Sequence, residues 1–147
     1  MKKRSITTDI FRLSQTDGSK QLFGVELLHG DFDDFFPYII SVLIKNEKGL
    51  ENLCEIMEHE YEDIFHAVQT DTLNTYRDGL LFGSCGSRGM LYCMLSEDRD
   101  AEVIERACAF YDFFEIEDRF ETEEEQQINR KIAALGKKLG KPVLLNR

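Results

Sequence analysis

The sequence predicts an α/β domain in which mostly parallel strands alternate with helices. Short, almost wholly apolar runs are typical of strands that are covered on both faces. Longer segments between them repeat apolar residues at spacings of three and four, as amphipathic helices do. The 147 residues are 42% hydrophobic and 31% charged, and they contain neither a low-complexity linker nor an internal repeat. We therefore expect a single domain over residues 1–147.

The first strands are predicted from apolar runs near the N-terminus. Residues 21–28 (QLFGVELL) read as a strand, and residues 10–13 (IFRL) with a turn-like segment after them can pair with it. Residues 1–20 are therefore expected to form an N-terminal β-hairpin or an extension. Residues 31–36 are predicted to be a loop or one helical turn, and residues 38–44 (YIISVLI) a buried strand.

Residues 48–68 form the clearest predicted helix. Apolar side chains recur along one of its faces: Leu50, Leu53, Cys54, Met57, Tyr61, Ile64, Phe65 and Val68. Residues 70–78 are polar and loop-like, and residues 80–82 predict a short buried strand. The glycine-rich loop GSCGSRG, residues 83–89, is interpreted as a tight turn from that strand into a helix.

The C-terminal half continues the alternation. Residues 90–95 are ambiguous, Asp100 can cap a helix that reaches Cys108, and residues 111–116 predict a strand. Thr122 and Glu125 fit a capping box. The helix after them has one apolar face and ends with a left-handed cap and a proline: Ile128, Ile132, Leu135, Leu139, Gly140 and Pro142. Residues 143–145 predict the last strand.

Composition excludes several classes of function. The net charge of −10 argues against a nucleic-acid binder and against docking on an anionic membrane. No apolar run is long enough for a membrane-spanning helix, and the basic start lacks the apolar stretch of a signal peptide. Four cysteines without a CxxC pair, and three histidines, make a structural zinc site an unfavoured interpretation. Cys54 and Cys108 fall on apolar helix faces, and the expected location is a reducing cytoplasm.

The histidines carry weak signals for chemistry. His59, Asp63 and His66 share one helix face, as metal ligands can. That face lies opposite the apolar one, which favours a solvated polar surface. His29 precedes a glycine and is interpreted as a loop residue.

Two acidic features and one loop remain open to a functional interpretation. Backbone amides of the GSCGSRG loop can form an anion nest to which Arg88 adds charge, and Cys85 is a candidate nucleophile without a histidine nearby in the sequence. Glu26 interrupts an apolar strand, so it either faces a site or turns outward to water. The acidic run at residues 115–125 is interpreted as a solvated loop and helix start.

Five segments resemble, in order, the PHP domain of PolC-type replicative DNA polymerase III alpha chains. They are residues 22–26 (LFGVE), 45–53 (KNEKGLENL), 76–84 (YRDGLLFGS), 110–116 (FYDFFEI) and 128–143 (INRKIAALGKKLGKPV). The resemblance covers about residues 21–147. It implies a partial, distorted β/α barrel with metal ions at the carboxyl ends of its strands, and metal-dependent phosphoester hydrolysis in members with a full ligand set.

The departures from the family pattern concern its metal ligands. Glu26 matches the family's acidic ligand, but the family histidine falls on Ile39 and the family cysteine on Gly86, with Cys85 displaced by one residue. The early H-x-H motif is absent, residues 8–10 (TDI) are at best a remnant of T-D-H, and the final D-x-H falls beyond the last residue. The exonuclease insertion is missing as well.

These departures predict a non-catalytic PHP-like interaction or structural module. We expect no catalytic residues and no bound zinc or manganese, with Glu26 as a ligand remnant and Cys85, Gly86 and Arg88 as a vestigial site loop. The alternatives are a piece of a split DNA polymerase III that acts in replication with other chains, a residual metal-dependent phosphoesterase, and an acidic decoy for a DNA-handling protein. Too few strands are present to close a barrel, so open sheet edges are expected to bind a protein partner or a second copy, and neither nucleic acid nor membrane.

Overall fold

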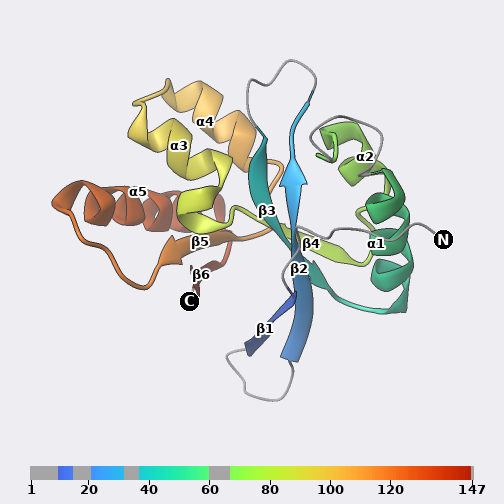
Figure 1. Cartoon of the computed structure of the whole chain (residues 1–147). Helices are drawn as coiled ribbons and strands as arrows, with labels where there is room; N and C mark the ends of the chain where they lie inside the picture. Colours follow the sequence, from blue (N-terminus) through green and yellow to red (C-terminus); the bar gives the residue numbers. More distant parts are fainter. Residues whose placement is uncertain (1–9, 15–20, 32–36, 60–66, 147) are drawn as a thin grey trace. The chain divides into compact units, whose positions relative to one another are not determined.

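The structure is a computed structural model that describes residues 10–14, 21–31, 37–59 and 67–146. The chain divides into two compact units, residues 1–81 and residues 82–147. Both units combine helices with strands, which confirms the predicted α/β class (Figure 1). The expectation of one domain over residues 1–147 stays a prediction.

The first unit is built on a sheet with the strand order β1-β2-β3-β4. Its elements are β1 (Ile10–Ser14), β2 (Gln21–His29), β3 (Tyr38–Ile44), α1 (Glu47–His59), α2 (Thr70–Thr75) and β4 (Leu80–Gly83), whose last residues belong to the second unit. The strands predicted at residues 21–28, 38–44 and 80–82 are all present.

Strands β1, β2 and β3 of this sheet pair antiparallel. The prediction of mostly parallel strands is therefore wrong for this sheet. β1 pairs antiparallel with β2, Ile10 lying opposite Val25, and β2 pairs antiparallel with β3, Glu26 lying opposite Ser41. The connections at residues 15–20 and 30–37 are too short for the crossover of a dozen or more residues that a parallel pair requires. The pairing of β1 with β2 agrees with the expected hairpin, whereas the partial barrel stays a prediction.

Helix α1 buries only part of the face that was predicted, Leu53 being buried as expected. Four of its residues are buried: Gly49, Asn52, Leu53 and Ile56. Leu50 is 52% exposed and Cys54 is exposed, although both belong to the predicted apolar face. The reason is that Gly49 and Asn52 pack closely against the turn at residues 78–79, and this packing sets the rotation of the helix.

The predicted helix over residues 48–68 is too long, because α1 has ended before Val68. Residues 60–66, which include the predicted apolar positions 61, 64 and 65, lie outside the described residues. Val68 instead extends the sheet: its amide donates to the carbonyl of Leu28 at 2.8 Å, and its carbonyl accepts from Gly30 at 3.1 Å. Pairing with the end of β2 therefore overrides the helical spacing of the sequence.

The second unit contains a β-α-β arrangement in which the two strands are parallel. Its elements are the 3-10 helix η1 (Gly86–Arg88), α3 (Met90–Ser96), α4 (Ala101–Cys108), β5 (Phe114–Glu117), α5 (Glu123–Leu139) and β6 (Val143–Asn146). β5 and β6 pair in parallel, Phe114 lying opposite Val143. The predicted parallel β-α unit is confirmed in this part of the chain. The strand predicted from residue 111 begins only at Phe114, and the ambiguous residues 90–95 are helical.

The predicted ends of α5 are confirmed. The hydroxyl of Thr122 accepts a hydrogen bond from the amide of Glu125 at 3.1 Å, and the Glu125 carboxylate accepts from the amide of Glu121 at 3.0 Å. Gly140 closes the helix in the left-handed region at φ 68°, where a glycine avoids the steric cost of a side chain. Asp100 precedes α4 as predicted, but its side chain makes no capping hydrogen bond.

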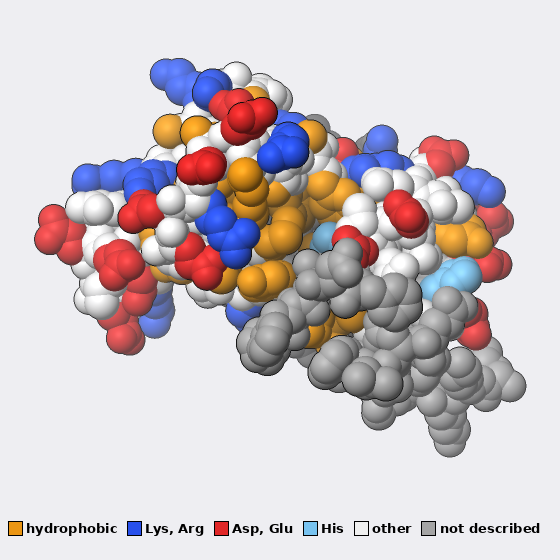
Figure 2. Space-filling model, turned by 90° about the horizontal axis from the view of Figure 1, so that it is seen from above, with side chains coloured by type: hydrophobic (Ala, Val, Ile, Leu, Met, Phe, Trp, Pro, Cys, Tyr) orange, Lys and Arg blue, Asp and Glu red, His pale blue; other side chains and the backbone are white. Residues whose placement is uncertain are grey.

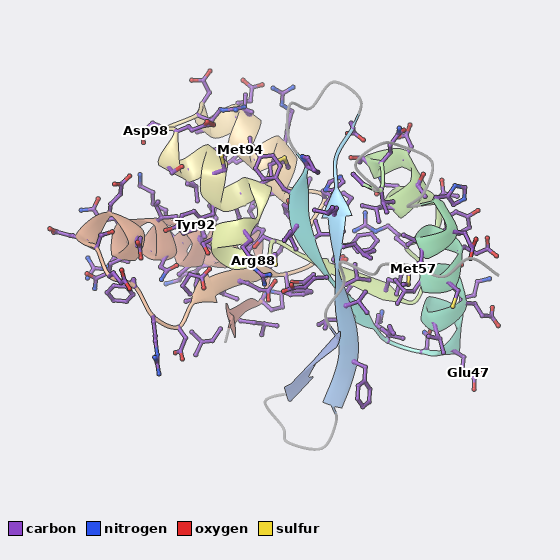
Figure 3. The ribbon with its side chains drawn as sticks, in the orientation of Figure 1. Glu47, Met57, Arg88, Tyr92, Met94 and Asp98 are labelled. Carbon is purple, nitrogen blue, oxygen red and sulfur yellow. The ribbon has the colours of Figure 1, made fainter. Side chains whose placement is uncertain are left out.

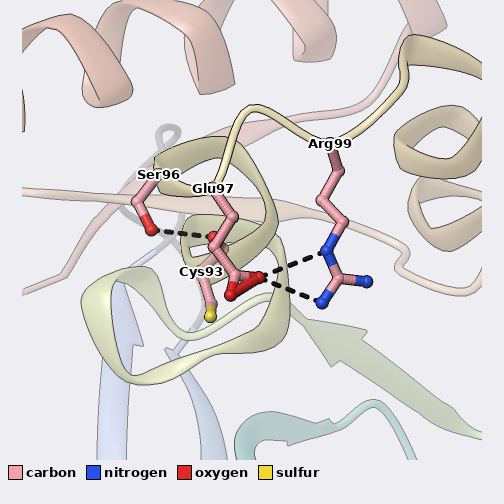
Figure 4. Close-up of polar contacts among 4 residues, drawn as sticks. All are labelled: Cys93, Ser96, Glu97 and Arg99. Carbon is pink, nitrogen blue, oxygen red and sulfur yellow. Dashed lines mark hydrogen bonds and ion pairs between the residues drawn. The ribbon is translucent and has the colours of Figure 1, made fainter.

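Exposed polar contacts hold the turn that follows α3. The Ser96 hydroxyl donates to the carbonyl of Cys93 at 2.8 Å, and the Arg99 guanidinium donates twice to one oxygen of Glu97, at 3.0 and 3.2 Å (Figure 4).

On the surface of the second unit, Asp and Glu side chains gather at the end where α5 begins (Figure 2). No helix in the described ranges is long and apolar enough to cross a membrane.

Candidate functional site

Glu26 lies in the middle of β2 and is buried, with 9% of its surface exposed. It stands opposite Ser41 of β3, which is 1% exposed. Directly opposed residues of an antiparallel pair share one face of the sheet, and two residues along β3 the same face carries Ile39, opposite Leu28. The acidic ligand of the family and its histidine position therefore lie on one face of neighbouring strands. Ile39 offers no donor atom there.

The GSCGSRG loop is a tight strand-to-helix turn, as predicted. Cys85 and Gly86 both adopt the left-handed region, at φ 61° and 56°, and η1 leads directly into α3. A Cβ atom on Gly83 would lie 2.2 Å from the ring of Phe113, so the loop can leave β4 in this position only with a glycine there. Cys85 is fully buried, and Arg88 lies on η1 beside the start of α3 (Figure 3).

Carboxylates of β5 bind the backbone amides of this loop. The amide of Cys85 donates to Glu115 Oε1 at 2.9 Å, and the amide of Ser87 donates to Glu117 Oε1. The amide of Glu115 in turn donates to the Ser84 hydroxyl at 3.0 Å. The anion nest considered from the sequence is thus bound by carboxylates of the chain itself.

Glu115 also corrects the interpretation of residues 115–125 as a solvated run. It is only 2% exposed, because its carboxylate accepts a loop amide that would otherwise be buried without an acceptor. A local signal exists, since Glu115 and Glu117 are two residues apart and therefore share one face of the strand. Tyr92 on α3 (Figure 3) has a raised hydroxyl pKa, first through burial and then through the charges of Glu125, Glu117 and Glu124.

Residues of the segment 128–143 hold the second unit together. The Asn129 side chain bonds both backbone groups of Glu117, donating at 3.1 Å and accepting at 3.2 Å. The ammonium of Lys141 donates to three carbonyls at the end of α4 and beyond it: Cys108 at 2.8 Å, Ala109 at 3.4 Å and Tyr111 at 2.5 Å. A cation here stabilises the carbonyls of the last helical turn, which have no partner within the helix.

The segments 45–53 and 76–84 meet in one packing joint of the first unit. The side chain of Asn46 accepts from the amide of Gly49 at 2.9 Å and so caps α1. The Asn52 side chain donates to the carbonyl of Asp78 at 2.8 Å. A Cβ atom on Gly49 would lie 1.9 Å from the carbonyl oxygen of Gly79. The resembled residues at this place therefore join a helix to a turn.

The sequence patterns did not predict a series of hydrogen bonds at the end of β2. His29, expected to be a loop residue, is the last residue of β2 and is buried. Its Nε2 lies 2.7 Å from the hydroxyl of Thr70, which donates to Asp31 Oδ2 at 2.8 Å, while the Thr70 amide donates to Asp31 Oδ1 at 2.8 Å. Because the hydroxyl gives its one hydrogen to Asp31, Nε2 donates to it.

This chain of contacts is structural in its chemistry. The imidazole donates to Thr70 and cannot take its proton, so the hydroxyl is not activated as a nucleophile. Asp31 instead accepts the first amide of α2 and thereby explains why residues 70–75 are helical, although residues 70–78 were predicted to be a loop. The buried side chain of Leu73 adds to this. A cap from 39 residues away leaves no local signal.

The structure describes only some of the remaining predicted histidine and cysteine positions. His59 lies 5.7 Å from the ring of Tyr76, measured between centroids, and Asp63 and His66 lie outside the described residues. Cys108 is buried as predicted, and burial raises the pKa of its thiol to about 11. That value keeps the thiol protonated and unreactive at neutral pH.

Tyr111 carries the one polar side-chain atom that is buried without a hydrogen-bond partner in the part of the chain that the structure describes. The side chain is 1% exposed and packs edge-on against Phe110 and Phe114. Burial raises the pKa of its hydroxyl, and the nearby Cys108 and Cys85 raise it further. The group stays neutral, so its role is packing.

The described residues do not fit the metal cluster that the family resemblance implies. Among them, no group of three or more His, Cys, Asp or Glu side chains is placed to hold a metal ion. Gly86 has no side chain at the family's cysteine position. The neighbouring Cys85 is fully buried, and its backbone amide donates to the Glu115 carboxylate. The expected loss of zinc or manganese stays a prediction, as does the absence of catalytic residues.

Comparison with known proteins agrees with the sequence resemblance. No family model matches the chain. Curated proteins named DNA polymerase III PolC-type are similar to it: 34% identity over 73% of the chain for Caldanaerobacter subterraneus subsp. tengcongensis, 31% over 71% for Clostridium perfringens, and 27% over 99% for Thermotoga petrophila.

The chain is related to PolC-type DNA polymerase III. It spans about a tenth of the length of these polymerases, the matched share being 9%, 8% and 11% of each. The relation supports a protein connected with DNA replication. Most of each PolC-type relative has no counterpart in the 147 residues.

Proposed function

We propose that the chain is a non-catalytic structural or interaction module derived from the PHP region of PolC-type DNA polymerase III. The proposal rests on one contrast. The residues that this chain shares with the family pattern make packing joints and caps, whereas two positions of the family's metal ligands carry residues without a donor side chain.

The residues that match the family pattern have structural roles in this chain. Asn46, Gly49 and Asn52 join α1 to the turn before β4. Asn129 and Lys141 fasten α5 and β6 to the backbone of β5 and to the end of α4. None of these interactions requires a metal or a substrate, and all of them stabilise the two units.

The ligand positions support the loss of chemistry. Ile39 shares a face with Glu26 but has no donor atom, and at Gly86 the ligand side chain is missing. Coordination tolerates deviations of only a few tenths of an ångström, about 0.2 Å. Cys85 stands one residue away from the family's cysteine position, and the bond from its amide to Glu115 holds its backbone in place, so it does not replace that ligand.

Metal analysis combined with a hydrolysis assay tests this proposal. The purified chain is dialysed against Zn²⁺ or Mn²⁺, its metal content is measured by mass spectrometry, and turnover of a phosphodiester is followed. We expect substoichiometric metal and the same background rate for the wild type and for Glu26→Gln. Tightly bound stoichiometric metal, with turnover that Glu26→Gln abolishes, would instead support a residual phosphoesterase and overturn the proposal.

A second candidate is a piece of a split polymerase that acts in replication together with other chains. It is favoured by the match to about a tenth of each PolC-type relative. Co-purification of a tagged chain from its own cells, with the partners identified by mass spectrometry, separates the two. Recovery of polymerase chains in fixed proportion supports the split polymerase, whereas recovery of the chain without them supports the independent module.

A further inference from the structure

The outer edge of β6 is open among the described strands. The small sheet of the second unit has the order β5-β6, and no described strand pairs with the other side of β6. An edge of this kind presents a row of backbone donors and acceptors that can bind a further strand.

The composition of β6 is that of an interior strand. Three consecutive apolar residues, Val143, Leu144 and Leu145, occupy it, and runs of this kind are typical of parallel strands that are covered on both faces. Leu145 is nevertheless 41% exposed. The strand has no lysine, proline or bulge within it, which are the usual protections of an edge.

The hydrogen bonds to β5 decide which residues of β6 face outward. The amide of Phe114 donates to the carbonyl of Pro142 at 2.9 Å. In a parallel pair successive residues alternate between the two neighbours, so Leu144 also bonds toward β5. Val143 and Leu145 therefore direct their amides and carbonyls to the open edge.

We propose that this edge pairs with β6 of a second copy, in antiparallel orientation about a two-fold axis at Leu144. Val143 then lies opposite Leu145 of the partner subunit, and the two residues exchange both backbone hydrogen bonds. The two Leu144 side chains face each other across the axis. The contact is isologous and closes on itself, so it yields a dimer and not a fibre.

The charges at the two ends of the strand favour the antiparallel orientation. Residues 117–125, which comprise the last residue of β5 and the segment after it, carry six acidic residues against one arginine. The last turn of α5, at the opposite end of the sheet, carries Lys137 and Lys138. Antiparallel pairing brings the acidic end of one copy toward the basic end of the other.

The same orientation keeps the acidic runs of the two copies apart. Their separation is at least the length of the four-residue strand, roughly 13 Å at about 3.3 Å per residue. This exceeds the screening length of about 8 Å at physiological ionic strength. A parallel arrangement would place the two runs side by side, and each copy has a net charge of −10.

A disulfide across the axis tests the register. Directly opposed residues of a non-hydrogen-bonded antiparallel pair have Cα atoms about 4.5 Å apart, which suits a disulfide. In a Cys54→Ser background, which removes an exposed thiol, Leu144→Cys is expected to form a disulfide-linked dimer under mild oxidation. Leu145→Cys is the matched control, because its two copies lie on a longer diagonal and are expected to stay uncrosslinked.

Light scattering over a range of concentrations tests the interface itself. The wild type is expected to approach twice its 17.1 kDa chain mass as concentration rises. Leu145→Pro removes one outward amide and is expected to remain monomeric, whereas Leu145→Val keeps the amide and is expected to dimerise. Circular dichroism checks folding, and Leu145→Lys replaces the proline variant if that variant does not fold.

Three results would overturn the proposal. The first is a wild type that stays at 17.1 kDa at every concentration. The second is dimerisation of Leu145→Pro or Leu145→Lys as strong as that of the wild type. The third is equal crosslinking of the two cysteine variants. None of these results bears on metal content or on phosphodiester turnover, so the dimer and the proposed function fail separately.

Discussion

Replacing Gly49 by alanine tests whether the retained glycine is a packing residue. The new Cβ atom would lie 1.9 Å from the carbonyl oxygen of Gly79 and 2.6 Å from its carbonyl carbon. Both atoms are backbone and cannot swing away. The first turn of α1 would have to move by roughly 1.5 Å to restore an ordinary contact of about 3.5 Å.

The expected cost follows from what that movement breaks. The amide of Lys45 donates to the Gly79 carbonyl at 2.9 Å, and Asn52 donates to the Asp78 carbonyl at 2.8 Å. Each bond contributes about 1 kcal/mol net, and overpacking costs about 1–3 kcal/mol. Alanine returns about 1 kcal/mol through its helix propensity. We therefore expect a loss of about 2–4 kcal/mol in the free energy of unfolding.

Urea unfolding followed by circular dichroism measures this change. Gly140→Ala is the control, because it has positive φ but no atom within 4 Å of the new Cβ, and we expect it to cost only about 1 kcal/mol. Helix propensity alone predicts the opposite sign for Gly49→Ala, namely a gain. A variant as stable as the wild type, or more stable, would refute the packing argument.

Three further predictions concern the second unit. Glu115→Leu leaves the buried amide of Cys85 without its acceptor and should lower the urea stability by about 1–3 kcal/mol; no loss would contradict the role of that carboxylate. Lys141→Met removes three carbonyl contacts and should cost about 1.5–3 kcal/mol, which thermal unfolding measures. Burial raises the pKa of the Cys108 thiol to about 11, so the free energy of unfolding should fall as pH rises from about 9 toward that value. At neutral pH, iodoacetamide should label the exposed Cys54 before the buried Cys108.

Local sequence patterns predicted a structural feature correctly where the interactions that cause it lie within a few residues of one another. The capping box at Thr122 and the left-handed Gly140 mark the ends of α5, because the bonds that end a helix are made by its own neighbours. The parallel pairing of β5 and β6 also follows from local order, since a helix joins the two strands. The turn through Cys85 and Gly86 was expected for the same reason.

Local patterns did not predict contacts between residues that are far apart in the sequence. The carboxylate of Asp31 starts α2 from 39 residues away, and Val68 leaves its helical pattern to pair with the end of β2. The buried position of Glu115 could have been suspected from its spacing to Glu117, but its acceptor role depends on a loop 30 residues earlier. Helix rotation likewise could not be read from α1 alone.

The sequence by itself determined the α/β class, most strands, the ends of α5 and the relation to PolC-type polymerases, because these depend on local chemistry and on residue identity. It also determined that Ile39 and Gly86 bring no metal-binding side chain. Only the tertiary structure decided that the first sheet is antiparallel and that carboxylates bind the amides of the GSCGSRG loop. Backbone amides carry no sequence signal of their own, and their partners are chosen only when distant segments fold together.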